Sequence, residues 1–462
     1  MQPAAHYNNL AKALIQQGDF RKAGECYVQA LSFEPNNPKL YLNYAVLLRH
    51  QLEYDKAIQC CQKAWALDPS FPPTYITLGN LLFELGKPKE AEDYYLKAIS
   101  LGELTNAIYE NLAAAYIDQQ RISEAISCLE TALRLNPASA GARYNLSSCL
   151  LLTGNFERGW ALRDATWREI HGQVLRESSR FVQPRWAGEP IDGKTILLSA
   201  EQGLGDTLQF VRYASMVSRL GAQVIVECPE PLVRLLATVP GVSHVITPDQ
   251  SLPAYDIYCP ILSLPVVFAT TLSTVPATVP YVAPDSDAIR VWETRIGQTD
   301  KLKVGLVWAG GLRDDPAAQS MDRKRSFNLS VFSPLGGLQN IQLYSLQMGN
   351  PAMQARSEPW VLPELIDLTD HFSDFMDTAG LVANLDLVIS VDTSTAHLAG
   401  AMGKPVWLLS RFDGCWRWLL DRHDSPWYPT MRIFRQDTPG DWGSVICNVV
   451  DELKRYTARL RK

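Results

Sequence analysis

The sequence of 462 residues lacks several features that would place it in a special class. No apolar run approaches the ~20 residues that a membrane-spanning helix needs, and the first ten residues lack the basic and then apolar pattern of a signal peptide. Nine cysteines are scattered without a CxxC pair or a Cys/His spacing that suits zinc. These absences argue against a membrane protein, a disulfide-rich secreted protein and a zinc domain, and they predict a cytoplasmic protein.

The sequence also has no surplus of positive charge. Its 43 Lys and Arg against 49 Asp and Glu give a net charge of −6. A nucleic-acid binder usually carries a basic face or tail, so we expect no nucleic-acid partner. What the chain does have is 47% hydrophobic and 20% charged residues, which over this length predicts a globular protein of two or three domains.

The N-terminal third repeats itself every 34 residues. Each unit reads as two amphipathic helices, with alanines where helices cross closely, glycine at the turn between them and proline where the second helix ends. The pattern resembles the tetratricopeptide repeat. The units are 4–37, 38–71, 72–105, 106–139 and a fifth that begins at 140. The recurring residues are Ala23, Ala57, Ala91 and Ala125, then Ala30, Ala64, Ala98 and Ala132, and the turn residues Gly18, Gly86 and Gly154. The fifth unit loses the pattern after its glycine, and we expect it to join the repeats to the next domain.

One column of the repeats carries side-chain amides. Asn9, Asn43, Asn111 and Asn145 hold equivalent positions in the first helix of their units, with Thr77 in the third unit. Amides both donate and accept, so a ladder of them along the concave groove can hold an extended polypeptide by its backbone. The alternative is that each asparagine bonds locally to the neighbouring turn. The sequence leaves both interpretations open, and the first predicts a protein acceptor as partner.

After about residue 180 the pattern changes to short apolar runs that alternate with helical stretches. Predicted strands lie at 194–200, 222–228, 244–247 and 256–262, then at 303–311, 341–349, 385–391, 404–410 and 431–436. A stretch rich in Pro and Thr at 270–287 separates the two groups and predicts a linker. Strands that alternate with helices twice over predict two parallel-sheet domains that bind ligands at the carboxyl ends of their strands. The predicted fold is therefore α + α/β, with a repeat array at 1–172 and α/β domains at 173–284 and 285–462.

The first candidate site follows the first predicted strand. Gly203 and Gly205 would allow a tight turn and a close approach of the backbone to a ligand, and Asp206 stands at the start of a predicted helix. Asp206 would either cap this helix or act as a general base that takes a proton from an acceptor hydroxyl or amide. The spacing also approaches that of a dinucleotide site, with Glu227 as the ribose-binding acid. Leu208 replaces the third glycine, and Asp206 would repel a pyrophosphate, so a dinucleotide is disfavoured.

Two further candidate sites lie in the second α/β region. Residues 392–397 follow a predicted strand, and their hydroxyls and free backbone amides at a helix start would form an anion site. An ordinary helix cap with a structurally bonded histidine is the alternative. Residues 322–326, in a predicted loop, are basic, and Arg325 could neutralise a diphosphate there unless the loop is simply a solvated surface. The residues assigned to the anion site are Asp392, Thr393, Ser394, Thr395 and His397.

An aromatic tract at 415–429 surrounds Arg417. Ring faces stack on sugars and an arginine can reach a phosphate, so the tract would wall a sugar pocket. Alternatively, it fills the core between the two α/β domains. No acidic DxD pair stands at a strand end, because Asp285 and Asp287 fall in the linker. We therefore expect no metal and no cofactor, with helix dipoles and arginine stabilising a leaving diphosphate.

These motifs together carry a resemblance to a known family. The stretches EQGLGDTLQFVRY, VGLVWAGG, YSLQMG, DTSTAHLAGAMGKP and WRWLLDRHDSPWYPTMRIFRQ are similar to the bacterial heptosyltransferases, and most of all to members with tetratricopeptide repeats in front of the catalytic region. The resemblance implies a GT-B fold of two Rossmann-like domains, with Asp206 as the catalytic base. It implies a nucleotide-sugar site that includes Gly203, Gly205, Arg325, Ser345, Gln347, Asp392, Thr393, Ser394, Thr395 and His397.

The chain departs from the lipopolysaccharide heptosyltransferases at Ser394, where they commonly carry glycine, and in its repeats, which they lack. A repeat groove suits a polypeptide acceptor, as in the repeat-bearing O-GlcNAc transferases and flagellin glycosyltransferases. We therefore expect an inverting, metal-independent glycosyltransferase that moves a sugar from a nucleotide-sugar to a protein presented by the repeats, flagellin-like or other. The alternative is a non-catalytic scaffold with a degenerate GT-B region. Repeat arrays often self-associate, so a homo-oligomer is compatible with either interpretation.

Overall fold

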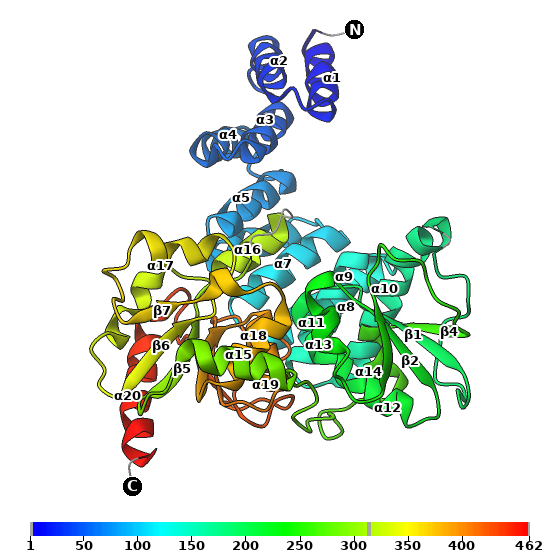
Figure 1. Ribbon diagram of the computed structural model, residues 1–462. Coiled ribbons are helices and arrows are strands. Elements are labelled where there is room, and N and C mark those ends of the chain that lie inside the picture. The colour runs from blue at the N-terminus through cyan, green and yellow to red at the C-terminus, as the bar shows by residue number, and fades with distance from the viewer. Residues whose placement is uncertain (1–2, 179, 312–315, 461–462) are drawn as a thin grey trace. The chain divides into compact units, whose positions relative to one another are not determined.

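The computed structural model describes residues 3–178, 180–311 and 316–460, and its internal contacts divide the chain into two compact units, Met1–Cys149 and Leu150–Lys462. The first unit is an array of helix pairs, and the second contains the sheets (Figure 1). None of the helices in the described residues is long and apolar enough to cross a bilayer.

The helices of the first unit follow the 34-residue period of the sequence. They are α1 (Pro3–Gln16), α2 (Phe20–Phe33), α3 (Pro38–His50), α4 (Tyr54–Leu67), α5 (Pro72–Glu84), α6 (Pro88–Ser100), α7 (Asn106–Asp118), α8 (Ile122–Leu135) and α9 (Ala140–Leu152), which crosses into the second unit. All eight recurring alanines are fully buried, as expected where helices cross closely. The predicted solenoid of tetratricopeptide repeats is confirmed.

The turn between the two helices of each repeat needs a left-handed residue. Gly18 and Gly86 have φ of 79° and 75° there, which glycine adopts without strain. The equivalent positions of the second and fourth repeats carry Leu52 and Gln120, with φ of 62° and 58°. The backbone geometry of the turn is therefore kept even where the sequence lacks the glycine.

The second helix of the fifth repeat, α10 (Phe156–Ser178), belongs to the second unit. Its Trp160 is buried against Phe156, Phe210, Trp416 and Trp427, with ring centroids 5.1–6.3 Å apart. The equivalent positions of the other repeats carry Gly24, Ile58, Glu92 and Ile126, so the tryptophan is particular to the fifth repeat. The helix that ends the repeat pattern is thus part of the core of the sheet-containing unit.

The second unit contains two sheets in which every paired strand is parallel. The first has the order β3-β2-β1-β4 and the second the order β10-β9-β8-β5-β6-β7. The strands are β1 (Thr195–Ser199), β2 (Gln223–Glu227), β3 (Val242–Ile246), β4 (Ile257–Pro260), β5 (Leu302–Val307), β6 (Ile341–Ser345), β7 (Leu365–Asp367), β8 (Leu387–Val391), β9 (Val406–Ser410) and β10 (Met431–Arg435). Sequence analysis predicted all of these except β7.

Helices lie in most of the connections between strands, as is usual for parallel pairing, whereas the connections from β3 to β4 and from β9 to β10 contain none. In the first sheet region they are α11 (Leu204–Phe210), α12 (Ala214–Ser218), α13 (Val233–Leu236) and α14 (Leu264–Val267), with short 3-10 turns η1 (Val211–Tyr213), η2 (Glu230–Leu232) and η3 (Ile261–Ser263). In the second they are α15 (Ser286–Ile296), α16 (Pro316–Arg325), α17 (Met353–Ser357), α18 (Phe375–Ala383), α19 (Ser394–Ala401) and α20 (Trp442–Leu460), with η4 (Leu329–Leu335), η5 (Asn350–Ala352) and η6 (Thr369–His371).

The strand order places a candidate binding position in each sheet. Strands β8 and β9 are buried along their whole length, which is typical of a parallel sheet covered on both faces. The chain runs outward from β5 in one direction to β6 and β7 and in the other to β8, β9 and β10. The connections therefore diverge between β5 and β8, and between β1 and β4 in the smaller sheet. Ligands bind at the carboxyl ends of strands where such a divergence opens a crevice.

Candidate functional site

Two of the predicted sites meet through Gly205 and His397. A Cβ placed on Gly205 of α11 would lie 2.9 Å from Cδ2 of His397 and 3.5 Å from Cα of Ser394, both on α19. Only a glycine allows the two helices to approach this closely. Gly203, by contrast, has φ −67° and ψ 164°, an extended conformation that any residue adopts. The glycine motif therefore serves helix packing at Gly205, and the tight turn expected at Gly203 is wrong.

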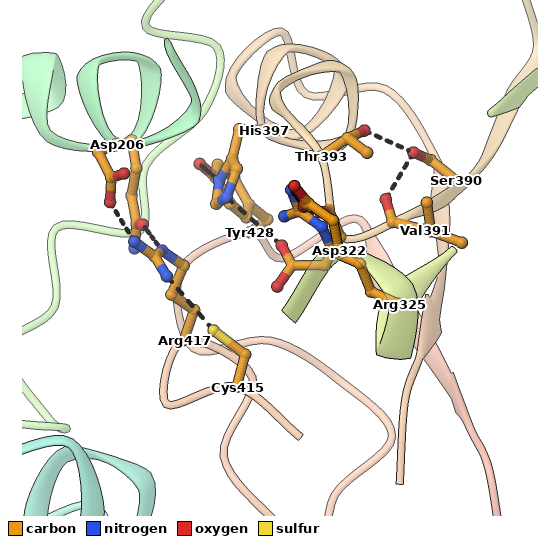
Figure 2. A network of polar contacts seen from close by, with 12 residues as sticks. Asp206, Asp322, Arg325, Ser390, Val391, Thr393, His397, Cys415, Arg417 and Tyr428 are labelled. Atoms are coloured by element: carbon orange, nitrogen blue, oxygen red, sulfur yellow. Dashed lines mark hydrogen bonds and ion pairs between the residues drawn. The ribbon is translucent and has the colours of Figure 1, made fainter. Parts of the chain in front are cut away.

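Asp206, in the first turn of α11, forms an ion pair with Arg417 (Figure 2). Nε of Arg417 also donates to the side chain of Gln209 at 2.9 Å, and Nη1 donates to Sγ of Cys415 at 3.3 Å. The guanidinium lies over the ring of Trp416 at 4.1 Å. Only 16% of the Asp206 side chain and 14% of the Arg417 side chain are exposed, so this pair is largely shielded from water.

His397 is buried beside the ion pair. Its Nδ1 lies 2.9 Å from the hydroxyl of Tyr428, and its ring stacks on Trp418 at 5.3 Å between centroids. Burial, together with the charge of Arg417, lowers the pKa of His397 to about 4. The imidazole is therefore neutral near pH 7.

Asp392 connects this histidine to the third candidate. One carboxylate oxygen of Asp392 is 3.8 Å from Nε2 of His397. Burial raises the pKa of Asp392, but the neighbouring His397, Arg417 and Arg325 outweigh burial and hold that pKa below its usual value. Asp392 is therefore a carboxylate near pH 7, and its backbone carbonyl accepts from Nη1 of Arg325 at 2.7 Å.

Arg325 stands at the end of α16, so the basic loop expected at 322–326 is wrong over most of its length. The last turn of a helix holds these residues, where cations are favoured. Arg325 forms an ion pair with Asp322, and its guanidinium packs on Gly310, where a Cβ would come within 2.7 Å of Nη2. Its buried Nε has no hydrogen-bond partner among the described residues. Among the described residues, Nε of Arg325 is thus the one donor of this guanidinium that is both buried and unbonded.

The start of α19 has an open first turn. Thr393 is the N-cap residue, but its side chain makes no cap hydrogen bond. Its hydroxyl lies 3.1 Å from Oγ of Ser390, which itself donates to the carbonyl of Val391 at 2.7 Å (Figure 2). Ser394 is half-buried and Thr395 is buried. The uncapped backbone N–H groups form the kind of position that binds anions.

Ser345 and Gln347 lie at the carboxyl end of β6, and both are buried. The side chain of Gln347 accepts from the backbone N–H of Trp308 and Ala309 at 3.0 and 2.8 Å and donates back to the carbonyl of Ala309 at 3.0 Å. These bonds fix the loop after β5 that carries Gly310, on which Arg325 packs. Gln347 therefore acts on the site through the backbone that it holds.

Two glutamates lie at the carboxyl ends of strands of the smaller sheet: Glu201, which is half-buried, after β1 and Glu227, which is buried, as the last residue of β2. Glu201 accepts from the backbone N–H of Ile261 and Leu262 at 3.1 and 3.2 Å, and burial raises its pKa to about 8. Glu227 forms an ion pair with Arg180. The acid that a dinucleotide's ribose would need is thus already bonded, which further weighs against that alternative.

The aromatic tract is core. Trp418, Trp427 and Tyr428 are fully buried, and Trp416 is nearly so. Between them lies Arg212, whose guanidinium donates to the carbonyls of Gln209, Pro276 and Trp427 at 2.8–2.9 Å and to the hydroxyl of Tyr281. Of the two interpretations of this tract, the structure favours the one in which the rings fill the interior. Of the two linker acids, Asp285 caps the N-terminus of α15 and Asp287 pairs with Arg290.

The amide column lies in the first unit. A pocket of about 610 Å³ is lined there by Asn8, Lys12, Asn43 and Thr77 among others, whereas Asn9 is exposed and is not among the lining residues. Asn43 donates to Asn8 at 2.9 Å, which is an amide–amide bond between neighbouring repeats. Asn111 makes the same kind of bond to Asn80 at 3.0 Å, and Asn145 is half-buried. The column is thus partly a set of inter-repeat bonds.

The interactions that sequence reasoning missed join residues far apart in the chain. Arg417 lies 211 positions from Asp206, and Tyr428 lies 31 positions from His397. Arg212 gives no motif because it bonds to backbone carbonyls and aromatic hydroxyls. The only signal available in the sequence was the density of aromatic residues around Arg417.

Comparison with known proteins agrees with the repeat assignment. Tetratricopeptide repeat models match residues 7–37, 26–59, 72–101 and 110–162. Protein FlbA of Caulobacter vibrioides is 26% identical over 418 residues, which cover 83% of this chain and 67% of that protein. Since the matched repeats end at residue 162 of 462, this likeness extends into the region of the sheets.

Solved structures add weaker likenesses. MamA (residues 41 to the end) from Desulfovibrio magneticus RS-1 is 16% identical with a TM-score of 0.33, covering 39% of this chain and 99% of its own. TTC0263, a thermophilic TPR protein of Thermus thermophilus, is 16% identical with a TM-score of 0.33, covering 38% and 97%. The family models therefore carry the assignment: the N-terminal part of this chain consists of tetratricopeptide repeats, modules that bind protein partners.

Proposed function

We propose that this protein is an inverting glycosyltransferase that uses a nucleotide-sugar and needs no metal, and that its repeats present a protein acceptor. The observation that carries the proposal is the contact of Gly205 with His397. It brings a carboxylate on α11, Asp206, next to the uncapped start of α19. A general base beside an anion-binding helix start is what transfer of a sugar from a diphosphate needs.

The strand orders support two Rossmann-like halves arranged as in the GT-B fold. Numbered within its own sheet, the larger sheet reads 3-2-1-4-5-6, the order of doubly wound nucleotide-binding folds. The smaller sheet reads 3-2-1-4, the first four strands of that same order. In this assignment the larger half binds the nucleotide-sugar and the smaller half supplies the base.

The donor's diphosphate would bind at the start of α19, near Thr393, Ser394 and Arg325, whose Nε has no partner among the described residues. The neutral His397 adds no charge there but can bond through the nitrogen not facing Tyr428. These groups stabilise the negative charge that grows on the diphosphate as the sugar leaves. Ser345 and Gln347, at the end of β6, help to shape the neighbouring nucleotide position.

The chemical step would be a single displacement. Asp206 takes the proton of the acceptor's hydroxyl or amide while that oxygen or nitrogen forms a bond to the anomeric carbon. The bond from the anomeric carbon to the diphosphate oxygen breaks, and its electron pair leaves with the nucleoside diphosphate. Attack from the face opposite the leaving group inverts the anomeric configuration.

Replacement of Asp206 by Asn tests the proposal. UDP-, GDP-, ADP-, CMP- and dTDP-linked sugars would first be screened by thermal shift, because a ligand of the folded state raises its apparent stability. With the donor found, Asp206→Asn should bind the donor at least as tightly as wild type, and its rate of transfer should fall about a thousandfold. Asp287→Asn, an exposed acid at the start of α15, is the matched control. Full transfer by Asp206→Asn would remove Asp206 as the base.

One observation favours the second candidate function, a non-catalytic scaffold. The carboxylate of Asp206 is already neutralised by Arg417, and the side chain of Arg325 by Asp322. A degenerate site would show such internal pairing permanently. In that case none of the nucleotide-sugars would bind to the well-folded protein, whereas protein partners would still bind to the repeats.

A further inference from the structure

We propose that Arg417 exchanges partners: it pairs with Asp206 until a diphosphate binds and then turns to the phosphate oxygens, which frees Asp206. This inference rests on the proposed function and adds to it a residue that controls when the base becomes available. Arg417 comes from the segment after β9, and Asp206 from α11 after β1. The pair therefore joins the two sheet regions at the carboxyl ends of their strands.

The pairing makes the carboxylate of Asp206 less available to an acceptor molecule. Oδ1 of Asp206 accepts from Nη2 of Arg417, and Nε of Arg417 donates to the side chain of Gln209. The guanidinium therefore competes with an acceptor molecule for this carboxylate. Asp206 is fully available as a base once Arg417 has turned away.

The surroundings of Arg417 allow such a movement. Its bond to the Cys415 thiol, at 3.3 Å, involves a weak acceptor that is readily exchanged for a phosphate oxygen. Its guanidinium lies flat on Trp416, and a planar cation can slide over a ring face while keeping its cation–π contact. Arg417 thus has three contacts that do not depend on Asp206, to Gln209, Cys415 and Trp416, of which the stacking on Trp416 can persist when the guanidinium turns.

A diphosphate at the start of α19 would be within the electrostatic reach of Arg417. The charge of Arg417 lowers the pKa of both Asp392 and His397, the residues that flank that helix start. The site already holds the carboxylates of Asp206, Asp392 and Asp322, so an incoming dianion needs a cation that can turn toward it. Guanidinium matches phosphate oxygens in two-point geometry, and Arg417 is the candidate whose present acid partner is the base itself.

The consequence is an ordered use of the site. Asp206 loses its pairing with Arg417 when the anionic donor binds. An acceptor molecule that binds after the donor therefore finds the carboxylate of Asp206 available as a base. Arg417 would then also face the leaving diphosphate when negative charge grows on it. Arg417 would thus pair with the base before the donor binds and contact the leaving diphosphate afterwards.

Binding of inorganic pyrophosphate to four full-length proteins tests this exchange without any knowledge of the sugar. The proteins are wild type, Arg417→Gln, Asp206→Asn and the double variant, compared by calorimetry. Arg417→Gln should weaken pyrophosphate binding about tenfold, because one charge-assisted contact is lost. Asp206→Asn should tighten it several-fold, because the anion no longer competes with Asp206 for the guanidinium. In the Arg417→Gln background the same Asp206→Asn change should have no effect.

Controls make each outcome decisive. Arg422→Gln removes the same charge from the same segment, where Arg422 pairs with Asp424, and should leave binding unchanged. Arg417→Lys, which keeps the charge but not the two-point geometry, should lie between wild type and Arg417→Gln. Near-ultraviolet circular dichroism verifies that the aromatic core around Trp416 is intact in each variant.

Three results would overturn the exchange. The first is that Arg417→Gln binds pyrophosphate as tightly as wild type. The second is that Asp206→Asn still tightens pyrophosphate binding when Arg417 is replaced by Gln. The third is that none of the four proteins binds pyrophosphate. The proposed function is judged separately, by transfer from the nucleotide-sugar. Wild-type transfer with an unchanged donor KM in Arg417→Gln would leave the glycosyltransferase standing and remove only the role of Arg417.

Discussion

The hydroxyl of Tyr428 and Nδ1 of His397 lie 2.9 Å apart in the interior of the sheet-containing unit. Burial raises the pKa of Tyr428, so the tyrosine stays a neutral phenol, and burial lowers the pKa of His397 to about 4. The two side chains form a neutral hydrogen-bonded pair next to the charged groups of Asp392, Asp206 and Arg417. This neutrality has a consequence for stability at acid pH.

We expect His397 to make the protein acid-sensitive between pH 6.5 and 4. In this window the unfolded histidine takes up a proton that the folded one does not, so stability falls as the pH falls through it. At pH 5 the loss amounts to about 2 kcal/mol. His397→Gln cannot be protonated and keeps an acceptor for Tyr428. The thermal midpoint of the variant minus that of wild type should therefore increase as the pH is lowered from 7.5 to 5. An identical acid loss in both proteins would contradict the neutral histidine.

We expect Gly205→Ala to separate α11 from α19. The new methyl group would lie 2.9 Å from Cδ2 of His397, so either the buried His397 ring or one of the helices must move. Overpacking of this kind costs about 1–3 kcal/mol, and it would also move Asp206 away from the start of α19. Thermal midpoints measure the first effect, with Gly203→Ala as the control, because Gly203 has an ordinary backbone conformation. Equal midpoints for the two variants would remove the packing role of Gly205.

The repeats and the strands were predictable because their signals are local. Each alanine column repeats one helix crossing every 34 residues, and each buried strand is a short apolar run between turn residues. Strand β7 (Leu365–Asp367) was missed because three residues, with Ile366 exposed, leave no such run. The division of the chain at residues 172 and 284 stays a prediction.

The site was predictable only in part. Asp206 and His397 were found because each follows a strand at a helix start, which is a local pattern. Their partners Arg417 and Tyr428 were not found, because contacts between the carboxyl ends of different strands depend on the fold and not on spacing in the sequence. Arg325 was expected in a loop because its neighbours are basic. The structure places Arg325 and its basic neighbours in the last turn of α16, where positive charge is favourable.

We expect Leu52→Gly to stabilise the repeat array. Leu52 has φ 62° at a turn where the first, third and fifth repeats carry glycine, and 69% of the residue is exposed. Removal of the left-handed strain should gain about 1 kcal/mol, since the side chain gives little packing in return. Leu52→Ala keeps the Cβ and therefore the strain, so it is the matched control. Slower amide exchange in α3 and α4 of the glycine variant alone is the expected readout, and equal exchange in both variants would contradict it.

We expect Trp160→Phe to be far milder than Trp160→Ala. Trp160 is buried among four aromatic rings, and truncation to Ala should cost about 3–5 kcal/mol by leaving a cavity under Trp416. Its indole N–H has no partner among the described residues, so Phe removes an unsatisfied donor along with some volume. Thermal unfolding followed by near-ultraviolet circular dichroism would rank the variants. Similar losses for Phe and Ala would mean that the indole has a partner in solution.

The amide column offers a test of how an acceptor is held. Asn43, Asn111 and Asn145, changed together to Ala, should raise the KM for a protein acceptor at least severalfold without lowering kcat, because they would lose bonds to its backbone. A short peptide that carries only the modified residue should be used equally well by both proteins, since it does not extend along the groove. The control removes Gln29 and Gln62, two exposed amides on the second helices of their repeats. An unchanged acceptor KM in the triple variant would reduce the column to the bonds between neighbouring repeats, of which Asn43 to Asn8 is one.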